Sequence, residues 1–274
     1  MADPYFSGKM FAKIARLALI ADELGEVAIR NNFTSKLKSY LTPWLNGTLS
    51  KGNHLVFDRH WKGVISCGCR YDDCYGKCTP HCANGGPPGD CPAFGDQGFD
   101  FGNGFYNDHH FHYGYFIYSA AAIARFDSEW AMKFNDSVLT LIRDIANPSE
   151  NDPYFPQFRM MDFYVGHSWA SGIVTAGTNP FMNGKDQEST SEAVNAWYAI
   201  SLFGDATKNE KVKDLGRTLL STELIGTHHY WQIRAGSQVY PSRYQNIHVF
   251  GIVWQHLAQF QTFFSGDFVI LCFI

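Results

Sequence analysis

The sequence predicts a mainly α-helical protein assembled from helical hairpins, and three observations support this fold class. Apolar residues recur at spacings of three and four over residues 6–24, which places them on one face of a helix. The same periodicity resumes after residue 107 and continues almost to residue 222. Proline- and glycine-containing segments divide it into consecutive helices, a succession typical of helical hairpins.

The first elements follow from this periodicity. The helix over 6–24 is expected to end at Gly25, and a second helix over 27–44 is expected to be interrupted at Pro43. The stretch "HLVFDRHWKGVIS" has short β-branched and aromatic runs, which predict one or two strands. Further helices are predicted over about 108–125, 128–146, 188–204 and 208–222.

The connection between the predicted helices ending at 146 and beginning at 188 is far longer than packing requires. Long ordered loops in compact domains usually carry function. Its polar and aromatic side chains are therefore expected to line a cleft at one end of the paired helices.

Composition and charge exclude two classes of partner. The 274 residues carry a net charge of -4, so there is no basic surface for nucleic acid or for a membrane. No stretch reaches the roughly 18 apolar residues of a membrane span, and the N-terminal segment is an amphipathic helix rather than a signal peptide. Aromatic residues make up 16% of the chain against 18% charged, which favours either an aromatic-rich core or a surface that presents rings to a sugar.

Six of the seven cysteines fall in one Gly/Pro-rich loop. An even cluster of this kind predicts three local disulfides in an oxidising compartment, although the spacing, together with His81, also suits a structural zinc site. The Asn-X-Ser/Thr sequences at Asn32, Asn46 and Asn135 fit an extracellular protein. The six clustered cysteines are Cys67, Cys69, Cys74, Cys78, Cys82 and Cys91, and Cys272 stands alone.

The segment "YNDHHFHYGY" supplies the first candidate for chemistry, Asp108. At the start of a helix its simplest role is that of an N-capping carboxylate. The rings around it would also raise the pKa of a carboxyl group and stack on a ligand. The neighbouring His109, His110 and His112 have the chemistry of metal ligands, but no cysteine or acidic residue stands at the spacing of a zinc site, and no metal or cofactor is predicted.

The second candidate is the pair Glu188 and Glu192 in "DQESTSEAVNAWYAI". Four residues apart on a helix, their carboxylates would project from one face about one turn apart. Solvated surface glutamates are one interpretation. The small and apolar flanking residues, followed by Trp197 and Tyr198, favour a pocket instead.

A third segment, "MDFYVGHSWASG", places Asp162, His167 and Trp169 beside glycines that allow sharp turns. It lacks the G-x-S-x-G turn of a serine nucleophile, which argues against acyl transfer. An acid that protonates a leaving oxygen, a carboxylate that activates water and aromatic walls are together what glycoside hydrolysis needs.

The segments "YNDHHFHYGY", "LIRDIANPS", "GHSWASG" and "QESTSEAVNAWYA" resemble the catalytic region of glycoside hydrolase family 81, the endo-β-1,3-glucanases, from Asp3 to about Phe264. This resemblance implies an α/α toroid of the (α/α)6 type that cleaves internal β-1,3-glucosidic bonds with inversion and without metal. It implies that Asp108 is the general acid and that one of Glu188 and Glu192 is the base, with Glu188 preferred. Implied sugar contacts are Asp58, Tyr106, His112, Asp162 and His167.

The resemblance also implies a domain organisation. Residues 1–264 are expected to form the toroid, with a Cys-rich insertion at about 66–98 and a divergent apolar tail at 265–274. The toroid is expected to be incomplete, and the β-sandwich region that precedes it in the family is not found. The implied partner is a β-1,3-glucan and the implied location is extracellular or at the cell wall. The alternative is a glucan-binding or inactive truncated relative, and the sequence predicts no oligomeric state.

Overall fold

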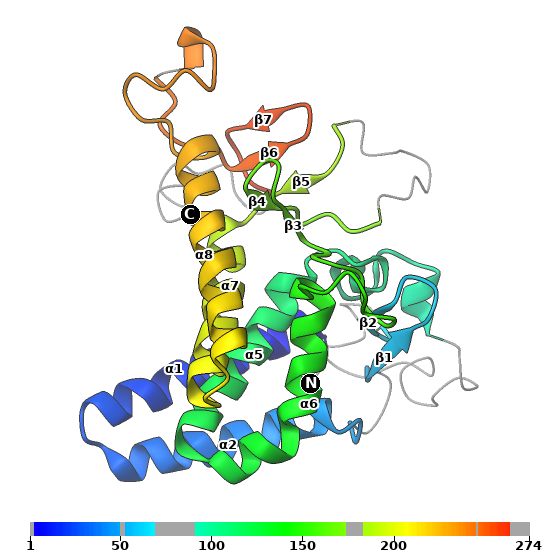
Figure 1. The fold of residues 1–274 in the computed structure, drawn as a ribbon, viewed down its shortest axis with the longest axis vertical. Coiled ribbons are helices and arrows are strands. Elements are labelled where there is room, and N and C mark those ends of the chain that lie inside the picture. Colours follow the sequence, from blue (N-terminus) through cyan, green and yellow to red (C-terminus); the bar gives the residue numbers. More distant parts are fainter. Residues whose placement is uncertain (1–2, 50–52, 69–90, 174–182, 245, 264–274) are drawn as a thin grey trace.

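The computed structural model describes residues 3–49, 53–68, 91–173, 183–244 and 246–263. Within these ranges, three helical hairpins form the body of the protein (Figure 1). The first helices of the hairpins lie in a row, with α5 between α1 and α7, and the second helix of each hairpin packs against its partner. The hairpins are α1 (Pro4–Glu23) with α2 (Val27–Leu45), α5 (His109–Phe126) with α6 (Ser128–Ala146), and α7 (Thr190–Ala206) with α8 (Glu210–Tyr230).

Helix α5 is central because its sequence is apolar or small on almost every side. Phe116 and Ile117 are fully buried, and so is Trp197 on α7. Gly114 of α5 lies directly against Ala196 of α7, since a Cβ atom added at Gly114 would stand 2.7 Å from the Ala196 Cβ. Small residues at this crossing allow the two helices that carry the candidate site to approach closely.

Three features of the helices differ from the sequence prediction. Pro43 does not interrupt α2, which continues to Leu45. Gly204 does not end α7, and its missing side chain instead makes room for α8, because an added Cβ would meet the Lys213 backbone nitrogen at 2.2 Å. The predicted last helix is also longer than expected and reaches Tyr230.

The strands are short and gather mainly at one end of α7 and α8 (Figure 1). The predicted strands near residue 60 form the antiparallel hairpin β1 (Leu55–Asp58) and β2 (Gly63–Ser66). β3 (Met161–Asp162) pairs with β4 (His167–Ser168). A three-stranded antiparallel sheet joins β5 (Asp186–Gln187), β6 (Ile252–Trp254) and β7 (Ala258–Gln259), and none of the strands β3 to β7 was predicted from the sequence.

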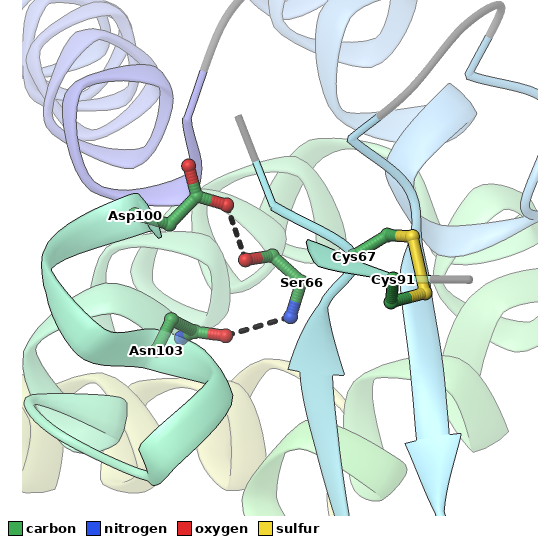
Figure 2. The surroundings of a disulfide bond; sticks show 5 residues. All are labelled: Ser66, Cys67, Cys91, Asp100 and Asn103. Atoms are coloured by element: carbon green, nitrogen blue, oxygen red, sulfur yellow. Dashed lines mark hydrogen bonds between the residues drawn. A yellow bond between two sulfur atoms is a disulfide. The ribbon is translucent and has the colours of Figure 1, made fainter. Parts of the chain in front are cut away.

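The Cys-rich loop is closed at its base by a disulfide between Cys67 and Cys91 (Figure 2). Beside it, Ser66 donates its hydroxyl to the Asp100 carboxylate and its backbone N–H to the Asn103 side chain, 2.6 Å away. The disulfide therefore joins β2 to the 3₁₀ helices η1 (Pro92–Phe94) and η2 (Phe99–Phe105), which lead to α5. The remaining cysteines and the predicted tail 265–274 lie outside the described residues.

Two properties of the described ranges bear on function. No helix there has the length and apolar composition that a membrane crossing requires. No cluster of three or more His, Cys, Asp or Glu side chains in those ranges is arranged to hold a metal ion.

Candidate active site

Asp108 stands at the junction of η2 and α5 in a left-handed backbone conformation, with φ 57° and ψ 19°. Its N–H donates to the Ala170 carbonyl at 2.9 Å, and its own carbonyl accepts from the His112 N–H at 2.9 Å. The carboxylate makes no capping hydrogen bond, so the simple capping role considered from the sequence is wrong. A non-glycine residue in this conformation is strained, and such residues cluster at functional sites.

Glu188 does not lie on a helix, which corrects the sequence prediction of two glutamates one turn apart. Asp186 and Gln187 pair with Trp254 and Val253 of β6, so the chain is extended up to Gln187. Ser189 is still non-helical, at φ -147° and ψ 82°, and α7 begins at the next residue. Glu188 therefore precedes α7, whereas Glu192 lies in its first turn.

The structure nevertheless brings the carboxyl groups of Asp108, Glu188 and Glu192 into electrostatic contact, together with Asp186. Burial, then the charges of Glu188, Asp186 and Glu192, raise the pKa of Asp108 well above its usual range. Burial, then Asp186 and Glu192, raise the pKa of Glu188 to about 8. Repulsion among these groups favours states in which one carboxyl keeps its proton while a neighbour is ionised, as acid–base chemistry requires.

Two tyrosines surround Glu192. The Tyr115 hydroxyl donates to Glu192 Oε1 at 2.6 Å. Burial, and then the Glu192 charge, raise the pKa values of Tyr5 and Tyr115 far above their usual range. Both hydroxyls therefore stay protonated, and Tyr115 can keep donating to the carboxylate.

A network of buried polar side chains involves the segments that carry Asp108 and Glu188. Ser168 Oγ is 3.1 Å from His110 Nε2 and accepts from Gln187 Nε2 at 2.8 Å. Glu223 Oε2 accepts from the Ser168 N–H at 2.9 Å and from Trp197 Nε1 at 3.0 Å. The network thus joins a residue just after Asp108 to one just before Glu188. Sequence reasoning missed Gln187, although it lies inside the "DQESTSE" segment, and Glu223, which lies one residue beyond the predicted end of its helix.

The other candidate histidines are held by hydrogen bonds inside the protein. His109 has Asp144 Oδ2 at 2.6 Å from Nδ1 and the Asn103 carbonyl at 2.8 Å from Nε2, and both partners are oxygen acceptors. Burial lowers the pKa of His110 to about 3, so this ring is neutral. His112 Nδ1 lies 3.1 Å from the Asn103 amide nitrogen. These contacts give the three rings structural roles.

Two of the five predicted sugar contacts line an open groove. Asp162 and His167, on the β3–β4 hairpin, border a cavity of about 1000 Å³. The Asp162 carboxylate accepts from Trp169 Nε1 at 3.1 Å, which orients this indole at the groove. Trp254 also lines the groove and pairs with Asp186, so the groove wall continues into the strand that leads to Glu188.

The other three predicted contacts are held by hydrogen bonds inside the protein. Asp58 accepts hydrogen bonds from the His60 N–H at 2.8 Å and from the Tyr106 hydroxyl at 2.8 Å, and it thereby closes the β1–β2 turn. Tyr106 and His112 are also buried. The hydrogen bonds of these residues support the segment that carries Asp108, and their partners are not the residues that line the groove.

Residues 1–78 and 90–272 match the family model of the glycosyl hydrolase family 81 C-terminal domain. The chain belongs to this family. The unmatched residues 79–89 fall within the Cys-rich insertion predicted from the sequence.

Named relatives in this family are about one-third identical to the chain over the aligned residues. A glucan endo-1,3-beta-D-glucosidase of Glycine max is 35% identical over 93% of the chain and 34% of the relative. The primary septum glucan endo-1,3-beta-D-glucosidase of Schizosaccharomyces pombe is 36% identical over 96% of the chain and 23% of the relative. The chain therefore spans about a quarter to a third of the length of the curated relatives it matches.

A solved family 81 structure supports the fold assignment. A mutant of the glycoside hydrolase family 81 protein from Clostridium thermocellum superposes with a TM-score of 0.73 at 32% identity, covering 97% of this chain and 33% of that one. The row of paired helices is accordingly an α/α toroid-type fold, as the sequence resemblance implied.

Proposed function

We propose that this chain carries the active site of an endo-acting β-1,3-glucan hydrolase that inverts the anomeric configuration. The observation that carries the proposal is the convergence of Asp108, Glu188 and Glu192 from separate segments, with the pKa of Asp108 raised by burial and by its acidic neighbours. Relatives named as glucan endo-1,3-beta-D-glucosidases support the substrate class.

In the proposed reaction, the protonated Asp108 carboxyl donates its proton to the glycosidic oxygen as the bond to C1 breaks. Ionised Glu188 takes a proton from a water molecule, whose oxygen attacks C1 from the opposite face of the sugar. The products are a new alcohol and an inverted reducing end, and the protons on the two carboxyls return to their starting places through solvent. Glu192, held by Tyr115, supports the base by keeping a second negative charge beside it.

The groove at Asp162 and His167 is the proposed sugar-binding surface. Carboxylate and imidazole groups hydrogen-bond sugar hydroxyls, while indole and phenol faces stack on the apolar faces of pyranose rings. Direct sugar contact by Asp58, Tyr106 and His112 stays a prediction, and their hydrogen bonds add a role in holding the acid's segment.

An oxidising location is part of the proposal. The Cys67–Cys91 disulfide is typical of proteins that act outside the cytosol. One relative is named as a primary septum enzyme, which supports a substrate in the cell wall. We therefore place the chain in an extracellular or cell-wall setting, with a β-1,3-glucan as its partner.

The test is the release of reducing sugar from laminarin by the parent chain, Asp108→Asn and Glu188→Gln. We expect activity in the parent and losses of roughly 10²–10⁴-fold in both variants, the range of general acid–base contributions. Glu129→Gln, an equivalent change at an exposed position of α6, is the control and should match the parent. NMR of early product should show the α-anomer. A folded parent that binds laminarin without cleaving it would replace the proposal with a glucan-binding role.

A further inference from the structure

We infer that Asp186 is a positioning residue for the acid and base, which joins their two segments and supplies a fixed negative charge beside both. The sequence alone predicts no role for this residue. The inference rests on the proposed function, because it names Asp108 and Glu188 as the groups that Asp186 serves.

The backbone of Asp186 lies in a direct line of hydrogen bonds to Asp108. The Asp186 carbonyl accepts from the Ala170 N–H at 2.7 Å, and the Ala170 carbonyl accepts from the Asp108 N–H at 2.9 Å. On its other side Asp186 pairs with Trp254 of β6. Asp186 thus fixes the strand that leads to Glu188 relative to the strained residue that carries the acid.

The Asp186 side chain is buried and has a neutral partner. The Ser171 hydroxyl donates to its Oδ1, and the Asp186 N–H donates back to Ser171 Oγ at 2.9 Å. This closed pair holds the carboxylate in one orientation. Burial raises the pKa of Asp186, and the hydrogen bond from Ser171 opposes that rise. Because a serine hydroxyl brings no positive charge, the negative charge of ionised Asp186 is not cancelled by this partner and acts on its surroundings.

The charged groups that interact with Asp186 are Asp108, which stands before α5, and Glu188, which lies two residues farther along the chain. Glu192, in the first turn of α7, acts on both of these carboxyls. Ser171 and Trp254, which contact Asp186 from the other sides, are neutral. The charge of the adjacent residue Lys185 interacts with the charges of Asp162 and Arg159.

The charge of Asp186 shifts the pKa of the acid and the pKa of the base in the same direction. This charge raises the pKa of Asp108, and it raises the pKa of Glu188 more than the charge of Glu192 does. Neutralising Asp186 therefore lowers both pKa values. The acidic limb of the pH profile, where the base is protonated, moves to lower pH, and so does the basic limb, where the acid loses its proton.

The experiment compares the pH dependence of kcat/KM on laminarin for the parent, Asp186→Asn and Asp214→Asn. Asparagine keeps the shape and can still accept from Ser171. We expect both limbs of Asp186→Asn to move down by about 1 pH unit, the lower end of the effect of a nearby charge. Asp214 is exposed on α8, and its variant should superpose on the parent.

A purely structural role would lower turnover without moving the limbs, and that result would overturn the inference. Asp186→Ser is the second neutral variant if asparagine prevents folding. Carboxyl ¹³C NMR titration of the same proteins needs no turnover, so it separates this inference from the proposed function. If the pKa values of Asp108 and Glu188 are the same in a folded neutral variant as in the parent, the role of Asp186 is refuted. If they are lower in the variant but the parent does not cleave laminarin, only the proposed function is refuted.

Discussion

Gly114→Ala tests whether the close approach of α5 and α7 governs both stability and activity. The new Cβ would stand 2.7 Å from Ala196 Cβ and 2.8 Å from Ala196 Cα, and real Cβ contacts are essentially never shorter than 3.0 Å. The second contact is with the backbone, so no side-chain rotation relieves it. The two helices must therefore separate.

Two opposing effects set the magnitude. Replacing glycine by alanine inside a helix gains about 1 kcal/mol of intrinsic helix stability. Overpacking a tight core costs about 1–3 kcal/mol, and the upper end applies here because a backbone atom must move. The net expectation is a loss of about 1–2 kcal/mol, which lowers Tm by about 2–8 °C in a chain of this size.

Urea unfolding followed by tryptophan fluorescence measures the loss, since Trp197 lies one residue from the contact. The double variant Gly114→Ala/Ala196→Gly removes the 2.7 Å contact but keeps the 2.8 Å one, so it should recover only part of the stability. Laminarin cleavage should fall as well, because α5 follows Asp108 and α7 carries Glu192. A single variant as stable as the parent would refute the packing argument and show that helix propensity outweighs the clash.

Two further stability predictions follow from buried groups. Cys67→Ser opens a loop whose ends are 24 residues apart, and loop-closure entropy predicts a loss of about 3 kcal/mol in urea unfolding; a stability equal to that of the parent would contradict this. Burial raises the pKa of Glu223 to about 7 from its usual 4.5. The folded state then binds this proton more tightly than the unfolded state does. Protonated Glu223 therefore contributes about 3 kcal/mol to the free energy of unfolding, which is complete below pH 4.5 and is lost as the pH rises through 7. Glu223→Gln should remove this part of the pH dependence from thermal denaturation measured at pH 5 and pH 8, and an unchanged dependence would count against it.

Much of the fold was predictable because it depends on local pattern. The period of apolar residues gave the six long helices to within a few residues, except at the end of α8. Pro43 and Gly204 are both local stop signals for a helix, yet neither stops its helix in the structure. The packing of α8 against Gly204 is a tertiary contact that the local sequence does not reveal.

The candidate site was predictable in its residues but not in its geometry. Asp108, Glu188 and Glu192 stand in distinctive segments, and residue type alone nominates them. The left-handed backbone of Asp108 depends on a hydrogen bond to Ala170, 62 positions later. The displacement of Glu188 from the helix depends on strand pairing of Asp186 with Trp254. Contacts between residues so far apart in the chain leave no periodic signal.

The sequence by itself determined the helical class, the family resemblance and the candidate carboxylates, because periodicity and short motifs are written in neighbouring residues. Only the tertiary structure decided which carboxyls share one buried environment and that Asp186 is among them. The protonation of a carboxyl depends on burial and on nearby charge, and both are properties of the assembled fold.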